Sequence, residues 1–199
     1  MGAKKDAARG QTTAERILDA AERLVQLRGF NGFSYADVAV ELKITKASLH
    51  YHFPSKAELG EALIRRYGER FGAALAAIDA AAADAPTKLE AYADLYAGVL
   101  EGQRMCLCGM LAAEYRTLPE PMRAAVVAFF DENETWLARV LRDGKRDETL
   151  DFDGPPRDMA QAIISTLEGA LLVSRPYAGS HRFRNTSRRL LATLASGRV

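Results

Sequence analysis

Apolar side chains recur at steps of three and four residues along almost the whole chain, and no stretch alternates apolar with polar residues. Residues 13–28 show the pattern, with Ile17, Ala21 and Leu24 on one stripe. Similar segments follow one another, separated by Gly, Pro and helix-capping residues. They span residues 13–28, 35–42, 46–53, 55–83, 87–102, 106–115, 119–142, 158–174 and 185–195. The sequence therefore predicts an all-α fold of about nine helices.

Composition narrows the class of protein further. The chain has 199 residues, of which 27% are charged, so it is long enough to bury a real core and is not built like a disordered segment. No apolar run approaches the ~18 residues of a membrane-spanning helix, and the polar N-terminus does not resemble a signal peptide. We therefore expect a cytoplasmic protein without a membrane partner. Two cysteines are too few for a disulfide framework or a four-thiolate zinc site, and no metal or cofactor is predicted.

Two short helices, 35–42 and 46–53, are joined by about three residues, which is the layout of a helix-turn-helix. In the second helix Leu49 and Phe53 are four residues apart and should face inward. The opposite face carries small, hydrogen-bonding, aromatic or cationic side chains and no carboxylate, so it could approach bases and phosphates without repulsion. Spacing alone leaves two interpretations open, namely a DNA-reading helix and a small solvated helix.

The same region resembles the tetracycline-repressor (TetR) family. The resemblance covers residues 13–63 and rests on residues 17–25 (ILDAAERLV), Gly29 with Phe30, Val38 with Ala39, residues 44–56 (ITKASLHYHFPSK) and Glu58 with Leu59. It implies a homodimeric transcriptional regulator. Three N-terminal helices would bind a double-stranded DNA operator, and a divergent C-terminal domain would bind a small-molecule effector and dimerise.

The resemblance assigns roles to individual positions. The expected DNA contacts are Ser34, Thr45, Lys46, Ser48, His50, Tyr51, His52 and Lys56. Two positions depart from the family pattern. Lys43 stands where the turn usually has Gly, so this turn needs either a left-handed Lys or another geometry. His50 replaces a usual Tyr, which would shift the preferred operator.

The resemblance also divides the chain into three parts. Residues 1–12 would form a flexible basic tail, in which Lys4, Lys5 and Arg9 could add DNA contacts. Residues 13–54 would form the DNA-binding domain, and residues 55–199 the ligand-binding and dimerisation domain.

An effector pocket is expected among the helices between residues 55 and 174, where aromatic and methionine side chains would make an adaptable apolar wall. The candidate ligand-binding residues are Tyr67, Phe71, Tyr96, Met105, Cys106, Met110, Glu114, Phe130 and Trp136, with Tyr92, Tyr115 and Phe129 as further wall residues. At helical spacing each of the apolar ones also fits a plain core. The carboxylate of Glu114 could meet a cation or a hydroxyl of the effector, lie exposed to solvent, or pair with Arg116 or Arg123.

Cys106 and Cys108 lie two residues apart, so on a helix their thiols point to nearly opposite sides and cannot easily share one site. Residues 105–114 (MCLCGMLAAE) are similar to the corresponding stretch of N-ethylmaleimide-responsive repressors in the same family, which sense electrophiles through a cysteine. One thiol would be a sensor if a helix start or a cation lowered its pKa. The alternative is that both cysteines pack as small apolar residues.

Two apolar helices near the C-terminus could form a four-helix interface with the same helices of a second subunit. The expected interface residues are Ile163, Leu167, Ala170, Leu171, Leu190, Leu191 and Leu194. The alternative is that these side chains are buried within their own domain.

Together these features predict a ligand-responsive DNA-binding regulator, most simply a repressor released from a palindromic operator by a small apolar or amphipathic effector. A thiol-sensing repressor acting through Cys106 or Cys108 is the alternative. An enzyme is not expected, because no Gly-rich phosphate loop, paired metal-ligand motif or nucleophile elbow is present. A helical protein-binding module would show no salt-dependent affinity for DNA.

Overall fold

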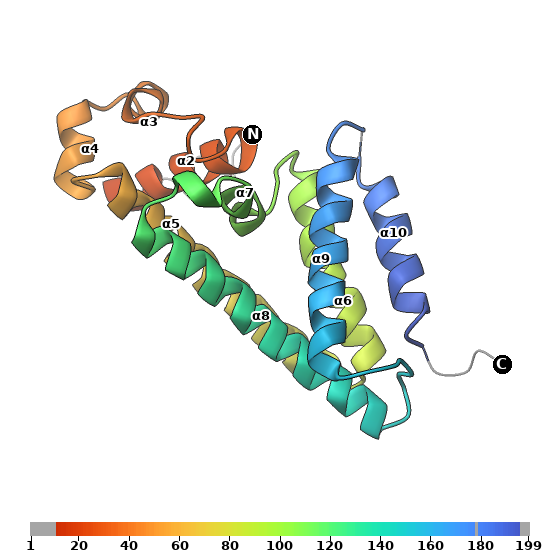
Figure 1. Cartoon of the computed structure of the whole chain (residues 1–199). Coiled ribbons are helices and arrows are strands. Elements are labelled where there is room, and N and C mark those ends of the chain that lie inside the picture. The colour runs from red at the N-terminus through yellow and green to blue at the C-terminus, as the bar shows by residue number, and fades with distance from the viewer. Residues whose placement is uncertain (1–10, 178, 196–199) are drawn as a thin grey trace.

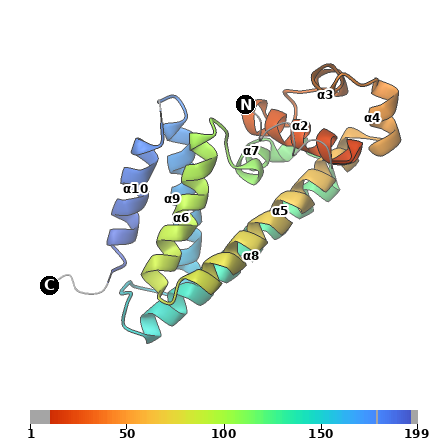
Figure 2. The same ribbon diagram turned by 180° about the vertical axis from the view of Figure 1, so that it is seen from behind.

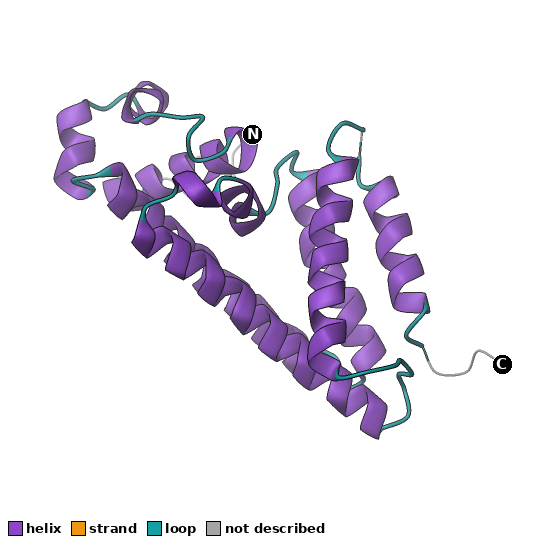
Figure 3. Cartoon of the chain, viewed as in Figure 1, coloured by secondary structure: helices purple, strands orange, loops and turns teal. Residues whose placement is uncertain are grey.

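The computed structural model describes residues 11–177 and 179–195, and within them the chain folds into α-helices without a β-strand (Figure 3). The all-α fold expected from the sequence is confirmed. The described elements are α2 (Thr13–Arg28), α3 (Tyr35–Leu42), α4 (Lys46–His52), α5 (Lys56–Ala81), α6 (Ala85–Glu101), α7 (Leu107–Ala113), the 3-10 turn η2 (Tyr115–Thr117), α8 (Glu120–Arg146), α9 (Pro156–Ser174) and α10 (His181–Ala192).

Helix starts follow from local capping chemistry. The Thr12 hydroxyl accepts the Glu15 N–H at 3.2 Å, and the Glu15 carboxylate accepts the Thr12 N–H in return, so Thr12 begins α2. The Ser55 hydroxyl accepts the Glu58 N–H at the start of α5. Lys4, Lys5 and Arg9 of the expected tail lie outside the described residues.

Several helix boundaries differ from the sequence prediction, among them those of α6, α8 and α10. Helix α6 begins at Ala85 and not at Thr87, because the Asp84 carboxylate accepts the Thr87 N–H at 2.8 Å and caps the helix earlier. Helix α8 continues through Gly144 to Arg146, so that glycine does not end the helix. It permits close packing, since a Cβ there would lie 2.5 Å from a Leu150 side-chain carbon. Helix α10 begins at His181, before the expected residue 185.

The helices form a head and a larger helical body (Figures 1 and 2). Helices α2, α3 and α4 make the head. The long helices α5 and α8 run side by side away from it, and α6, α9 and α10 pack at their far end. The short helix α7 lies against α2, α5 and α8, so it joins the head to the body.

The core is continuous from head to body. In the head, Ile17, Val38 and Leu49 are fully buried, and in the body Tyr92, Tyr96 and Phe183 are among the largest fully buried side chains. Burying aliphatic and aromatic side chains of this size stabilises the fold by about 1.5–3 kcal/mol each. The head is therefore a packed unit that can hold α4 in a fixed orientation.

Candidate DNA interface and effector region

The turn between α3 and α4 is built on a left-handed residue. Lys43 has φ 56° and ψ 44°, and its N–H donates to the Val40 carbonyl. The Ile44 N–H donates to the Ala39 carbonyl at 3.1 Å. The sequence raised a left-handed Lys as one of two possibilities, and the structure confirms it. This conformation costs a non-glycine residue about 1–2 kcal/mol, and the surrounding helices must offset that cost.

Helix α4 is held by one buried side chain and presents the rest. Leu49 has no exposed surface, and the Thr45 hydroxyl caps the helix by accepting the Ser48 N–H at 3.1 Å. Lys46 and His50 are exposed, and 84% of the Tyr51 side chain is accessible. The exposed face lacks a carboxylate, as the sequence indicated.

The tip of α4 is fixed by contacts with α3. The Tyr35 hydroxyl donates to the Phe53 carbonyl at 2.7 Å, and the Tyr35 ring packs 4.8 Å from the His50 ring. The Nδ1 of His50 lies 3.1 Å from the Pro54 carbonyl oxygen, which can only accept. Nδ1 must therefore carry a proton, which leaves Nε2 as the acceptor of the neutral ring.

Four of the eight expected DNA contacts surround one open hollow of about 370 Å³ on the head. They are Ser34, Lys46, His50 and Lys56. His52 is half-buried, with its ring edge against the Tyr51 ring. The structure thus gathers side chains from the start of α3, the exposed face of α4 and the start of α5 into one surface, which we call the head face.

Two of these side chains are already engaged. The Ser34 hydroxyl donates to the Asp37 carboxylate at 2.6 Å, which places an acid where a phosphate contact was expected. The Lys56 ammonium donates to the Phe30 and Phe33 carbonyls at 2.5 Å each and lies over both phenyl rings. Burial lowers the pKa of Lys56. The DNA contact expected of Lys56 stays a prediction, but in this structure its ammonium holds the turn after α2 and is not free on the surface.

The aromatic residues expected around an effector do come together in the body. The Phe71 ring lies 5.3–6.2 Å from four neighbouring rings, those of Tyr67, Tyr92, Tyr96 and Phe129. The Trp136 ring stacks on Tyr92 at 5.6 Å. Met105 and Cys106 are buried, and Met110 and Phe130 are half-buried at the edge of the cluster. We call this group the aromatic cluster.

Glu114 lies away from the aromatic cluster. Its carboxylate accepts the Phe30 N–H at 2.5 Å and the Asn31 N–H at 3.3 Å, so it binds the turn after α2. Gly29 makes room for it, because a Cβ there would lie 2.6 Å from a Glu114 carboxylate oxygen. Its expected role in ligand binding stays a prediction, and the contact that the structure shows joins the body to the head.

Other polar contacts join the head to α5 and to the end of α9. Glu22 of α2 is buried and pairs with Arg66 at 2.8 Å and with Arg70 at 2.5 Å, both from α5. Arg175 donates to the Leu27 carbonyl at the end of α2. A buried carboxylate paired with two guanidinium groups is costly to separate, so the head and α5 should move together.

Both cysteines are buried and neither is activated. Cys106 caps α7, where its sulfur accepts the Gly109 N–H at 3.5 Å and the Tyr67 hydroxyl at 3.6 Å. Burial, reinforced by the nearby Glu168 carboxyl, raises the pKa of the Cys106 and Cys108 thiols. The helix start, which could have lowered a thiol pKa, is outweighed by this burial. The buried positions of Cys106 and Cys108 support the interpretation that both cysteines pack as small apolar residues.

Alkylation separates the two interpretations of the cysteines. Native protein treated with N-ethylmaleimide should keep its operator affinity within about twofold, because a buried protonated thiol is a poor nucleophile. The measurement is operator binding before and after treatment, with mass spectrometry to count labelled thiols. A Cys106→Ala variant serves as the control. Loss of binding that this variant prevents would establish thiol sensing.

Glu168 was not recognised from the sequence. It lies on α9, its Oε1 atom is buried without a hydrogen-bond partner in the described structure, and burial raises the pKa of its carboxyl to about 7. A signal was available, because Glu168 falls four residues after the buried Ile164 and three before the buried Leu171. That spacing puts an acid on the inward face of an apolar helix.

The expected dimer residues divide into two groups. Ile163, Leu167, Leu171 and Leu194 are almost completely buried within their own subunit, so they cannot form the surface of an interface. Ala170, Leu190 and Leu191 are half-buried. On α9, Leu172 and Val173 are 60% and 55% exposed, one step along the helix from the expected stripe. The dimer contact stays a prediction, and these exposed positions are further candidates for it.

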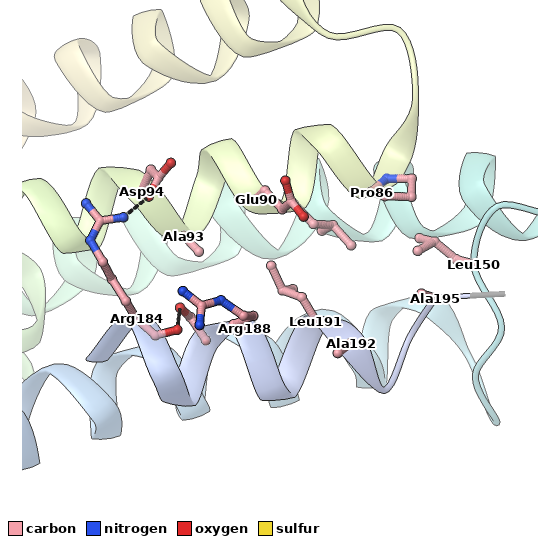
Figure 4. Close-up of a pocket in the computed structure, with 12 residues that line it drawn as sticks. Pro86, Glu90, Ala93, Asp94, Leu150, Arg184, Arg188, Leu191, Ala192 and Ala195 are labelled. Carbon is pink, nitrogen blue, oxygen red and sulfur yellow. Dashed lines mark hydrogen bonds and ion pairs between the residues drawn. The ribbon is translucent and has the colours of Figure 1, made fainter. Parts of the chain in front are cut away.

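A separate cleft of about 460 Å³ opens between α6 and α10 (Figure 4). It has an apolar floor and a rim that carries both charges, and Arg184 crosses it to pair with Asp94 at 2.6 Å. Its lining residues are Pro86, Leu89, Glu90, Ala93, Asp94, Leu150, Arg184, Ser187, Arg188, Leu191, Ala192 and Ala195. None of the residues expected to bind an effector lies there.

The helix-turn-helix head and the all-helical body together define a DNA-binding regulatory protein. The comparisons with known proteins agree. Residues 17–63 match the bacterial regulatory proteins of the tetR family, and residues 85–190 match the tetracyclin repressor-like C-terminal domain. The chain therefore belongs to the TetR family of transcriptional regulators.

Individual relatives extend the match over most of the chain. A TetR-family regulator from Agrobacterium tumefaciens superimposes with a TM-score of 0.89 at 32% identity, covering 92% of this chain and 97% of that one. The repressor NemR of Escherichia coli is 26% identical over 82% of this chain and 84% of its own length. The regulator AcuR of Cereibacter sphaeroides is 27% identical over 73% of this chain and 68% of its own.

Across residues 11–177 and 179–195, no helix is both long and apolar enough to cross a membrane. The same residues hold no group of three or more His, Cys, Asp or Glu side chains arranged to bind a metal ion.

Proposed function

We propose that the protein is a homodimeric repressor that binds a palindromic operator through α4 and leaves it when a small effector binds in the body. The observation that carries the proposal is the head face. Leu49 and Tyr35 fix α4, while Lys46, His50 and Tyr51 remain exposed without a competing acid on that helix. Such a helix can enter the major groove and place these side chains against base edges.

Release follows from the geometry of a dimer. Two recognition helices must sit about 34–36 Å apart to enter successive major grooves on one face of the duplex. The contacts of Glu22 and Glu114 make the head follow α5 and α7. An effector that fits only one arrangement of the body helices shifts the population away from the spacing that DNA requires. We infer that the effector is small and apolar or amphipathic, because the side chains of the aromatic cluster are themselves apolar or amphipathic.

The DNA that flanks the protein's own gene is the first substrate for a mobility-shift test. We expect a tight shift that a duplex of scrambled sequence does not give. A Tyr51→Ala variant should bind about ten- to a hundredfold more weakly, since it removes the most exposed side chain of α4 from both half-sites. Thr135→Ala, an exposed change on α8, is the matched control. Equal binding of scrambled DNA, or no effect of Tyr51→Ala, would refute the proposal.

A further inference from the structure

The carboxyl group of Glu168 is the least satisfied polar group near the aromatic cluster. Its Oε1 atom is buried and accepts no hydrogen bond from the described residues, and no ion pair involving it occurs among them. The Cys106 thiol, a weak donor, is the one hydrogen-bonding neighbour of the carboxyl among the described residues, and it leaves Oε1 unpaired. A buried carboxylate without a stronger partner costs several kcal/mol of stability. A ligand that donates to this oxygen would remove that cost.

The surroundings of Glu168 are shaped around its carboxyl. It approaches α7 so closely that a Cβ at Gly109 would overlap its Oε2 oxygen, so the glycine leaves room for the carboxyl in this position. The Cys106 thiol lies beside it, and the Tyr67 hydroxyl in turn contacts that thiol at 3.6 Å. Tyr92 and Tyr96 of α6 are close enough to sense its charge. Hydroxyl, thiol and aromatic groups surround the acid, and no lysine or arginine of the described residues forms an ion pair with it.

An acid beside aromatic faces is the combination that recognises an organic cation. The carboxylate supplies the countercharge and accepts an N–H bond, and the rings attract the same positive charge through their faces. A neutral apolar effector would use the rings but leave Oε1 unpaired. The charge and hydrogen-bonding capacity of the site therefore both favour a small ammonium compound.

We propose that Glu168 anchors a buried binding site for a small organic ammonium ion, formed by α9, the start of α7 and the tyrosines of α5 and α6. This rests on the proposed function, since it names the chemical class of the effector. The site also contacts α7, the helix that joins the body to the DNA-binding head. Glu168 presses on the first turn of α7, and Glu114, directly after α7, binds the head.

Binding of n-butylammonium, compared with its neutral analogue 1-butanol, tests the proposal at pH 8. Trp136, the only tryptophan in the chain, stacks on Tyr92 and reports binding by fluorescence. We expect n-butylammonium to bind the full-length protein at least about tenfold more tightly than 1-butanol does. Glu168→Gln keeps the shape and removes the charge, and should lose that tenfold preference. The exposed Glu69→Gln on α5 is the matched control and should keep it.

Three results would overturn the proposal. They are equal affinity of the two probes, equal affinity of the parent protein and Glu168→Gln, and no binding of n-butylammonium at millimolar concentration. If Glu168→Gln does not fold, the parent protein still decides the question. Protonation of the carboxyl should weaken n-butylammonium binding about tenfold between pH 8 and pH 5.5, and an affinity that does not change would contradict the site. Operator binding without probe, measured separately, shows whether any failure extends to the proposed function.

Discussion

Raising the salt concentration from about 50 to 200 mM should weaken operator binding by roughly ten-thousandfold. About four phosphate contacts per half-site release their counterions on binding, so the logarithm of the affinity should fall against the logarithm of the salt concentration with a slope near −7. The measurement is a series of mobility shifts or anisotropy titrations on one operator duplex. A slope near zero would exclude a phosphate-tracking interface and with it the function proposed for the head.

A pair of lysine variants makes this prediction specific to the head face. Lys46 is exposed at the start of α4, so Lys46→Met should reduce the slope by about 2, one contact in each half-site. Lys56→Met should leave the slope unchanged, because that ammonium is bound to the Phe30 and Phe33 carbonyls. It should instead lower the free energy of unfolding by about 2 kcal/mol, since two carbonyls lose a charged donor. A reduced slope for Lys56→Met would show that this side chain swings out to the DNA.

The overall fold was readable from the sequence because the signals for it are local. A step of three and four between apolar residues, with Thr12, Ser34 and Ser55 at helix starts, needs no knowledge of distant contacts. The dense resemblance over residues 13–63 identified the family for the same reason, because the head is short and its spacing is strict. Gly144 shows where local sequence signals fail to predict the end of a helix. A glycine that ends a helix and one that admits a neighbouring helix look the same in a sequence.

The candidate site was only partly readable, because the roles of its charged residues are set by distant partners. Lys56 and Glu114 both carry charges suited to a ligand, but they meet across the turn at residues 29–33, which comes from another part of the chain. Leu167 and Leu171 lie on an apolar stripe that the sequence makes visible. The sequence does not say whether this stripe packs inside its own subunit or against a second subunit. The apolar spacing of α9 predicts a buried face but does not show that the Glu168 carboxyl on that face lacks a strong partner.

The second large effect concerns that acid and the pH dependence of stability. Burial raises the pKa of Glu168 to about 7 in the folded protein, against an ordinary value of 4.5. At a pH between these two pKa values, the carboxyl group keeps its proton in the folded chain and has lost it in the unfolded chain. The contribution of Glu168 to the free energy of unfolding should therefore be fully present below about pH 4.5. It should be lost as the pH rises through 7, which lowers the free energy of unfolding by about 3 kcal/mol.

Glu168→Gln isolates the effect, because a neutral amide of the same shape does not titrate. The difference in free energy of unfolding between the parent protein and this variant, measured by urea denaturation from pH 4.5 to 8, should shift by about 3 kcal/mol in favour of the variant. The other titratable groups that face the carboxyl do not contribute to this pH dependence. Cys106 and Cys108 on α7, Tyr67 on α5, and Tyr92 and Tyr96 on α6 all have raised pKa values and stay protonated over this range.

Glu69→Gln, an exposed carboxyl on α5, should show no comparable shift with pH. A parent protein whose stability rises relative to Glu168→Gln as the pH increases would mean that the carboxylate has a partner in solution, and the unpaired oxygen would then not be available to a cation. A decline in the parent protein that n-butylammonium reverses at pH 8 would tie the acid to ligand binding, because the ammonium ion stabilises only the ionised form that burial disfavours.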